Sequence, residues 1–93
     1  MIRINCFVQL KDAANRSEVI ENAKALVKET LEGDKGCISY DFFESTTREG
    51  VFMFCETWAS QADLDAHSAS RHFKLHVGAI ERLADVHIET LEK

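Results

Sequence analysis

Groups that can move protons gather in the middle of this chain. Tyr40 lies in a strand signal opened by a glycine, and a second strand signal ends in Glu56 and Trp58. His67 and His72 follow in a helical segment that begins directly afterwards. A neutral imidazole can take a proton from a phenol near pH 7, while a phenol or an indole can donate a hydrogen bond to an oxyanion. Acid–base chemistry on a phenolic substrate is therefore one hypothesis for this region.

Each strand residue also has a simpler interpretation. Glu56 is either a strand-end carboxylate in water, or paired with Arg3, or else a partly buried acid with a raised pKa beside aromatic rings. Trp58 is either a packing anchor or a donor to a ligand oxygen. Tyr40 has the same two interpretations, packing or a phenol donor at a pocket wall.

The histidines differ in their expected surroundings. His67 is the better placed, because a short helix that follows Trp58 must fold back over the strand it left. His72 and His76 share a helix face at i and i+4, but such a pair supplies two metal ligands at most, and HExxH is absent. No metal is predicted, and His76 and His87 are interpreted as solvated surface side chains.

Charge and composition narrow the expected partners and location. The net charge of -5 argues against nucleic acid, which needs clustered lysine and arginine. No basic amphipathic stretch or long apolar run indicates a membrane. The three cysteines form no CxxC pair and lie in apolar strand signals, where they act as inert small hydrophobes. We expect a cytoplasmic protein that binds neither nucleic acid nor membrane.

Periodicity assigns the elements that position these residues. Asn15 with Glu18 predicts a capping box at the start of a long helix, Ser60 with Asp63 starts a short second helix, and Ser70 restarts it after a break. The apolar face of that last segment includes Ala84. The expected strands are 2–10, 37–44, 51–58 and a short one over 86–90, with a hairpin loop at 45–50.

The order βαββαβ predicts a ferredoxin-like α+β fold, one domain over 1–93, with a four-stranded antiparallel sheet and helices on one face. Because the first and third strands are neighbours in this fold, we expect Asn5 to lie beside Glu56. The third strand is apolar on both faces, while helices can cover only one. A homodimer with two sheets packed face to face is therefore predicted.

Three motifs make the chain resemble the antibiotic biosynthesis monooxygenase superfamily of small dimeric α/β-barrel proteins, which includes quinol monooxygenases. They are Gly-Cys-Ile-Ser-Tyr at 36–40, the strand end Glu-Thr-Trp at 56–58, and Ala-His-Ser-Ala-Ser-Arg-His-Phe at 66–73. The resemblance implies a monooxygenase without a cofactor, which oxidises a hydroquinone or polycyclic phenol with molecular oxygen. It implies these roles: His67 or His72 as the base, Trp58, Tyr40 and Asn5 as donors, and Phe7, Phe54, Phe73 and Glu56 around the substrate.

Other members of the superfamily give three alternatives. Haem-degrading relatives use a strand asparagine and the tryptophan, which Asn5 and Trp58 match, but Val77 stands where their helix histidine is expected. Relatives that isomerise a small phosphorylated signalling metabolite would use cations such as Arg71 and Lys74. A dimer that only binds a small molecule is the third alternative.

Overall fold

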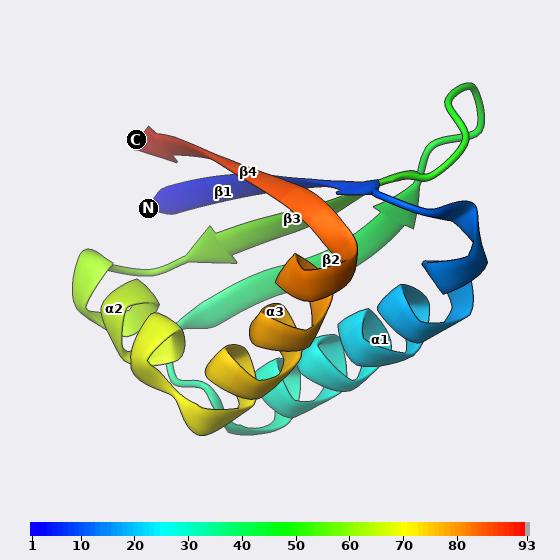
Figure 1. Cartoon of the computed structure of the whole chain (residues 1–93). Coiled ribbons are helices and arrows are strands. Elements are labelled where there is room, and N and C mark those ends of the chain that lie inside the picture. Colours follow the sequence, from blue (N-terminus) through cyan, green and yellow to red (C-terminus); the bar gives the residue numbers. More distant parts are fainter. Residues whose placement is uncertain (93) are drawn as a thin grey trace.

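The chain forms a single antiparallel sheet with its helices on one face (Figure 1). This computed structural model describes residues 1–92; residue 93, the last of the domain expected over 1–93, lies outside the described residues. The elements in order are β1 (Ile2–Leu10), the 3-10 helix η1 (Ala13–Asn15), α1 (Arg16–Gly33), β2 (Cys37–Glu44), β3 (Val51–Trp58), α2 (Gln61–Ala69), α3 (Arg71–Leu83) and β4 (Ala84–Glu92).

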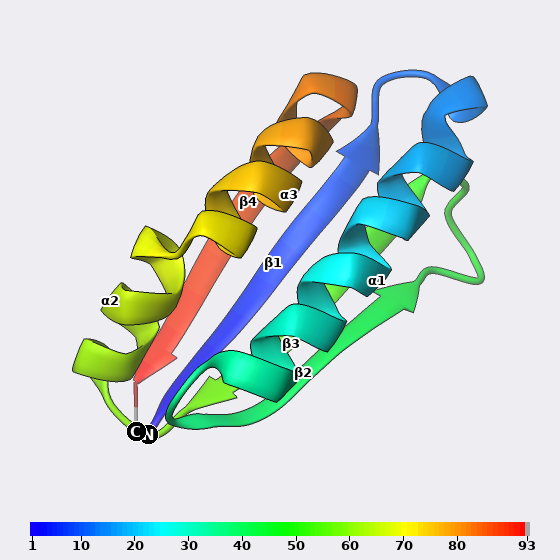
Figure 2. The same cartoon turned by 90° about the horizontal axis from the view of Figure 1, so that it is seen from below.

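The topology is the ferredoxin-like βαββαβ arrangement that the sequence predicts. The strand order is β2-β3-β1-β4, and every neighbouring pair is antiparallel. Helices α1 and α3 lie side by side across the sheet, and α2 lies near the end of the sheet where β3 finishes (Figure 2). The sheet therefore forms one wall, and the helices the other, of the space that holds the candidate site.

All three predicted cap residues stand at the N-cap positions of their helices, and two of them make the capping hydrogen bond. The Ser60 hydroxyl accepts a hydrogen bond from the backbone N–H of Asp63, and the Ser70 hydroxyl accepts one from Phe73. The capping box at Asn15 is wrong, because the side chain of Asn15 makes no capping hydrogen bond. Asp12 accepts from the backbone N–H of Ala14 instead, since the chain enters α1 through the 3-10 turn η1.

The end of α3 also differs from the expectation. Ala84 was expected on the apolar face of this helix, but it begins β4, where its side chain is buried. The last strand is consequently longer than the short segment 86–90 that the sequence predicts, and it pairs with β1 along its whole length.

The register between β1 and β3 decides which side chains face the helices. Ile4 pairs with Glu56, and Asn5 pairs with Cys55. Because directly paired residues share a face and successive residues alternate, Glu56 faces the helices while Asn5 faces away from them. The expectation that Asn5 lies beside Glu56 is therefore wrong.

The core lies between the sheet and the helices. Val19, Ala23 and Leu26 of α1 and Ile80 of α3 pack against the inward side chains of the sheet. Burial of one large aliphatic side chain stabilises the fold by about 1.5–3 kcal/mol. The far face of the sheet is covered by no described helix (Figure 1), and apolar side chains on it such as Phe43 remain about half exposed.

The turn between α1 and β2 is held close to α2. Gly36 has a φ of +79°, a conformation that side chains with a Cβ rarely adopt. A Cβ at this position would also overlap the side chain of Asp63 in the first turn of α2. The backbone oxygen of Gly36 accepts a hydrogen bond from the N–H of Ala59 at 2.8 Å. This contact holds the turn after α1 against the residue that follows β3.

Among the described residues, no helix combines the length and the apolar character that crossing a membrane requires.

Candidate active site

A cavity of about 340 Å³ lies between the sheet and the helices. This volume is at the lower end of the range of about 300–1,000 Å³ that is typical of small-molecule sites. Exposed side chains such as Gln61 of α2 and Glu81 of α3 also line it, so the cavity reaches the surface. Its inner wall is largely apolar, with Tyr40, Glu56 and His67 as the polar groups buried there.

Five of the nine predicted site residues line this cavity. They are Tyr40, Phe54, Glu56, His67 and Phe73.

The other four predicted site residues do not line it. Trp58 is completely buried and contacts Glu56, while His72 contacts the loop after α1. Asn5 and Phe7 lie on the far face of the sheet, because their register positions alternate away from the helices. Their predicted roles as donor and wall of this cavity are therefore wrong.

Glu56 is a buried carboxyl group at the cavity wall, with 7% of its surface exposed. The indole N–H of Trp58 donates to its Oε1 at 3.0 Å, and the hydroxyl of Tyr40 is a second hydrogen-bond donor. Burial raises the pKa of Glu56 to about 7, because the effect of desolvation exceeds the opposing effect of the two donors. Arg3 lies on the other face of the sheet, so the solvated and ion-paired interpretations of Glu56 are both excluded.

His67 is the most enclosed polar residue of the site, with 1% of its surface exposed. Its Nε2 lies 3.4 Å from the hydroxyl oxygen of Tyr40, and its Nδ1 lies 2.6 Å from Oδ2 of Asp34. The rings of Trp58 and Phe73 surround it, with centroids 4.6 and 5.0 Å away. Burial lowers the pKa of His67, and the neighbouring Asp34 carboxylate partly opposes this effect.

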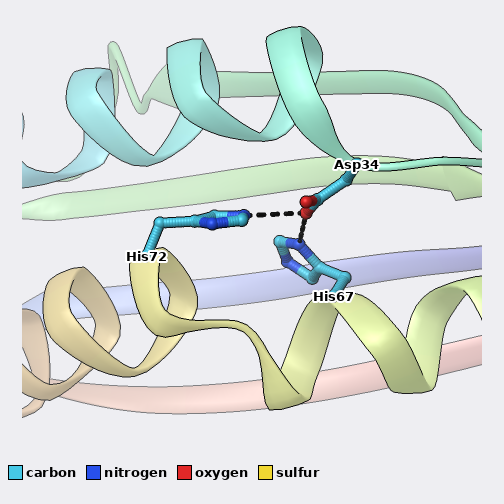
Figure 3. Close-up of side chains that lie close together, drawn as sticks. All are labelled: Asp34, His67 and His72. Carbon is cyan, nitrogen blue, oxygen red and sulfur yellow. Dashed lines mark hydrogen bonds and ion pairs between the residues drawn. The ribbon is translucent and has the colours of Figure 1, made fainter.

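Asp34 joins two histidines from different helices (Figure 3). Its Oδ2 lies 2.6 Å from Nδ1 of His67 in α2 and 2.8 Å from Nε2 of His72 in α3. The hydroxyl of Ser70, between these two helices, lies 3.2 Å from the same nitrogen of His72. The C-terminal end of α1, the end of α2 and the start of α3 therefore meet at one carboxylate oxygen.

The sequence pattern did not identify Asp34 as a functional residue. The residues Gly-Asp-Lys-Gly at 33–36 predict only a turn that ends the long helix, and the backbone of Asp34 directly after α1 is extended as such a turn requires.

Asp34, His67 and His72 have ligand types that zinc accepts, and their facing atoms all lie within 4.8 Å of one another. Ligand atoms around a tetrahedral zinc ion would be roughly 3.3 Å apart, given metal–nitrogen distances of about 2.0–2.1 Å. The observed nitrogen–oxygen distances of 2.6 and 2.8 Å are shorter and fit N–H···O hydrogen bonds. We therefore describe the three side chains as a hydrogen-bonded group.

The remaining two histidines lie away from the cavity. His76 was interpreted as a solvated surface residue, but its side chain is 12% exposed and its Nδ1 lies 3.1 Å from Oδ1 of Asn22 in α1. That interpretation is wrong, because α1 packs directly on α3. His87 is exposed on the far face of the sheet, where it stacks on Phe7.

Cys6 also lines the cavity, but its thiol is a poor nucleophile. Burial, with a smaller effect of Glu56, raises the pKa of the thiol to about 12. Burial likewise raises the pKa of Cys37 to about 11. Both remain thiols at neutral pH, so neither is a nucleophile candidate.

Solved structures with this fold cover nearly the whole chain. A conserved protein of unknown function from Bacteroides thetaiotaomicron, described as a possible oxidoreductase, is 46% identical; the match covers 99% of this chain and 96% of that one, with a TM-score of 0.93. A structure described as an antibiotic biosynthesis monooxygenase is 26% identical, covers 100% and 98% of the two chains, and has a TM-score of 0.90.

A sequence relative gives a shorter match. An uncharacterized protein of Synechocystis sp. is 40% identical over 45 residues, which is 48% of this chain and 31% of that protein. The match therefore spans less than a third of the length of this curated relative. Residues 1–79 match the family described as antibiotic biosynthesis monooxygenase. A general monooxygenase-like function is what the family and the names of its structural neighbours support. The chain belongs to the antibiotic biosynthesis monooxygenase family.

Proposed function

We propose that the cavity binds a hydroquinone or a polycyclic phenol and that the protein oxidises it with molecular oxygen, without a cofactor. The observation that carries this proposal is Glu56, a buried carboxyl group at the cavity wall with a pKa of about 7. A base with a pKa near the working pH is suited to take a phenolic proton. Glu56 replaces His72 as the candidate base, since His72 does not line the cavity.

The reaction needs no external reductant. Loss of a phenolic proton to Glu56 gives an electron-rich anion that can pass electrons to oxygen directly. A hydroquinone and O₂ then yield a hydroxyquinone and water: one oxygen atom forms the new carbon–oxygen bond, and the other leaves as water with two protons. The substrate supplies all four electrons. Tyr40, the donor that the resemblance implies, hydrogen-bonds with Glu56 and faces His67, so its single hydroxyl proton serves these two groups. The apolar walls of the cavity exclude water from the substrate anion.

The walls of the cavity favour a flat, apolar substrate. Phe54 of β3 and Phe73 of α3 lie on different sides of it, with Ile80 and Val8 among the further apolar residues. Aromatic rings stack on such side chains in offset or edge-on arrangements. These walls support an aromatic ring system rather than a strongly hydrated substrate.

The residues present do not fit haem. Asn5, the asparagine that haem-degrading relatives would use, lies on the far face of the sheet. His76 points to Asn22 of α1, and Val77 lines the cavity in its place. His67, the histidine in the cavity wall, has one ring nitrogen engaged by Asp34 and the other facing Tyr40.

A phosphorylated substrate is not favoured either. No lysine or arginine of the described chain lines the cavity, and its charged lining residues are Glu56, Asp65 and Glu81. Arg71 and Lys74, which the isomerase alternative would use, are exposed and do not line the cavity. A phosphate group would meet negative charge here without a cationic partner.

The proposal includes a homodimer in a reducing cytoplasm. The far face of the sheet carries apolar side chains, among them Phe7, Phe43 and Met53, which a second copy of this sheet could cover. The three cysteines are free thiols, which suits a reducing compartment.

Oxygen consumption by chelator-treated protein, measured with a panel of hydroquinones and anthrones, tests this function. We expect uptake above the autoxidation rate and at least a 100-fold lower rate in Glu56→Gln, which keeps the shape of the side chain but removes the base. The matched control is Glu21→Gln, at an exposed position on α1, which should leave the rate unchanged. Saturable binding of the same ligands without oxygen uptake would instead identify a binding protein, and a Soret band with hemin would favour haem.

A further inference from the structure

A continuous line of hydrogen-bonding groups leads from the cavity wall into the helix layer. The carboxyl group of Glu56 shares a hydrogen bond with the hydroxyl of Tyr40, whose oxygen lies 3.4 Å from Nε2 of His67. On the other side of the ring, Nδ1 lies 2.6 Å from Oδ2 of Asp34, and that oxygen also meets Nε2 of His72 at 2.8 Å. The three side chains drawn in Figure 3, Asp34, His67 and His72, thus continue a line that starts at the candidate base.

Asp34 decides which nitrogen of His67 carries the proton. An ionised carboxylate only accepts hydrogen bonds, so a ring nitrogen 2.6 Å from it must carry a hydrogen. Burial lowers the pKa of His67 and favours the neutral ring, which has a single N–H. That N–H is therefore at Nδ1, and Nε2 presents its lone pair to Tyr40.

We propose that Asp34 is a positioning residue, which keeps Nε2 of His67 free to take a proton from Tyr40. His67 is then a second proton acceptor, which Glu56 reaches through Tyr40. This inference rests on the proposed function. The arrangement of base, imidazole and orienting carboxylate follows the logic by which a third group fixes a histidine for proton transfer.

The transfer balances in protons and bonds. Protonated Glu56 passes its proton to the Tyr40 oxygen while the hydroxyl proton of Tyr40 moves to Nε2 of His67. Only O–H and N–H bonds form and break, and no electrons are transferred. Tyr40 never becomes a phenolate, which matters because burial raises its pKa well above the usual range. His67 ends as an imidazolium next to the Asp34 carboxylate, which offsets the positive charge.

A second proton acceptor at His67 fits the proposed reaction. A hydroquinone can release two phenolic protons, and formation of water from one oxygen atom consumes two. When the first proton has moved to His67, Glu56 is again a carboxylate and can take the second. Both protons then return along the same path to the oxygen atom that leaves as water.

The groups around His67 come from every element that packs against it. They are Asp34 from the turn after α1, Tyr40 from β2, Trp58 from β3, and His72 and Phe73 from α3. Asp34 raises the pKa of His67, whereas a positive charge on His72 would lower it. Removal of the Asp34 charge should therefore lower the pKa of His67 further, so that His67 no longer accepts the second proton.

The geometry can be tested without turnover. Nitrogen-15 NMR spectra of the imidazole rings distinguish a proton at Nδ1 from one at Nε2. We expect neutral His67 to carry its proton at Nδ1 in the wild type at pH 7, and to lose this preference in Asp34→Asn. A wild-type His67 protonated at Nε2 would overturn the proposal, since no lone pair would then face Tyr40. Saturable one-to-one Zn²⁺ binding that removes both N–H signals at Asp34 would also overturn it and identify a metal site.

Kinetics provide the second test. With a substrate of the wild type, Asp34→Asn should lower kcat about 10- to 100-fold and change the pH profile, while KM stays nearly constant. Asp12→Asn, which removes the charge of an exposed carboxylate at the start of η1, is the matched control and should keep the wild-type kcat. A normal kcat and pH profile in Asp34→Asn would overturn the proposal. Absence of oxygen uptake in the wild type would refute the proposed function and with it the catalytic role of the relay, whereas the NMR result would still decide its geometry.

Discussion

Trp58 donates its indole N–H to Glu56 at 3.0 Å from a position only two residues further along β3. Residues i and i+2 of a strand share a face, so both side chains point to the helices. Trp58 is completely buried and does not line the cavity, whereas Glu56 does. The tryptophan is therefore in contact with the carboxyl group of Glu56 and not with the cavity itself.

Trp58→Phe should raise the pKa of Glu56, because it removes a hydrogen bond that stabilises the carboxylate. The acidic limb of the kcat/KM profile should shift to higher pH. The smaller ring should also lower the free energy of unfolding by about 1–3 kcal/mol. Oxygen uptake as a function of pH and urea denaturation measure the two effects. An unshifted pH profile would mean that the indole of Trp58 packs in the core without affecting the pKa of Glu56.

Glu56→Gln should change how stability depends on pH. Burial raises the pKa of Glu56 from 4.5 to about 7, so between these values the folded protein holds a proton that the unfolded chain releases. The free energy of unfolding of the wild type should therefore fall as the pH rises through this window, by on the order of 3 kcal/mol in total. The variant should lack this decline and be the more stable protein at pH 8.

Burial lowers the pKa of His67, which gives a trend of the opposite sign below about pH 6.5. Both proteins contain His67, so its effect largely cancels in the difference between their denaturation midpoints. Parallel curves for wild type and variant from pH 4.5 to 8 would contradict a raised pKa at Glu56.

Gly36→Ala should destabilise the protein by at least about 1 kcal/mol, since it forces a Cβ into a left-handed backbone conformation and against Asp63. Gly33→Ala is the matched control: no atom lies within 4 Å of its would-be Cβ, and it lies in α1. This change should be neutral or slightly stabilising. Thermal unfolding compares the two variants. Equal midpoints would show that the turn between α1 and β2 accommodates a Cβ at position 36 without loss of stability.

Met53→Glu should dissociate the proposed homodimer, because it places a charge on the far face of the central strand β3. Leu75→Glu is the control, at a position that is 61% exposed on α3. Sedimentation velocity at micromolar concentration should find dimers for the wild type and the control. A monomeric wild type would refute the homodimer.

The sequence predicts well what local patterns determine. The bounds of β2 and β3 match the structure, because alternating side chains and a polar hairpin loop mark them. Ser60 and Ser70 cap their helices as predicted, since a cap depends on only a few adjacent residues. Asn15 also stands at the N-cap of α1, but its side chain makes no capping hydrogen bond, and Asp12 caps the preceding 3-10 turn.

The sequence does not determine features that depend on pairing between distant segments. The face of Asn5 depends on the register of β1 against β3, and a shift of one residue would move it to the other face. Asp34 meets histidines 33 and 38 residues further along the chain. No local pattern at 33–36 indicates that two later helices will end and begin there.

The break between α2 and α3 has a consequence for the spacing of the two histidines. Five residues of an unbroken helix turn by about 500°, so the two rings would point about 140° apart. The joint at Ser70 removes this rotation and lets His67 and His72 meet the same oxygen atom. The joint sets the spacing of the two rings, and its serine also caps α3 and lies 3.2 Å from Nε2 of His72. Insertion of a single residue beside Ser70 should separate the rings even with every side chain retained.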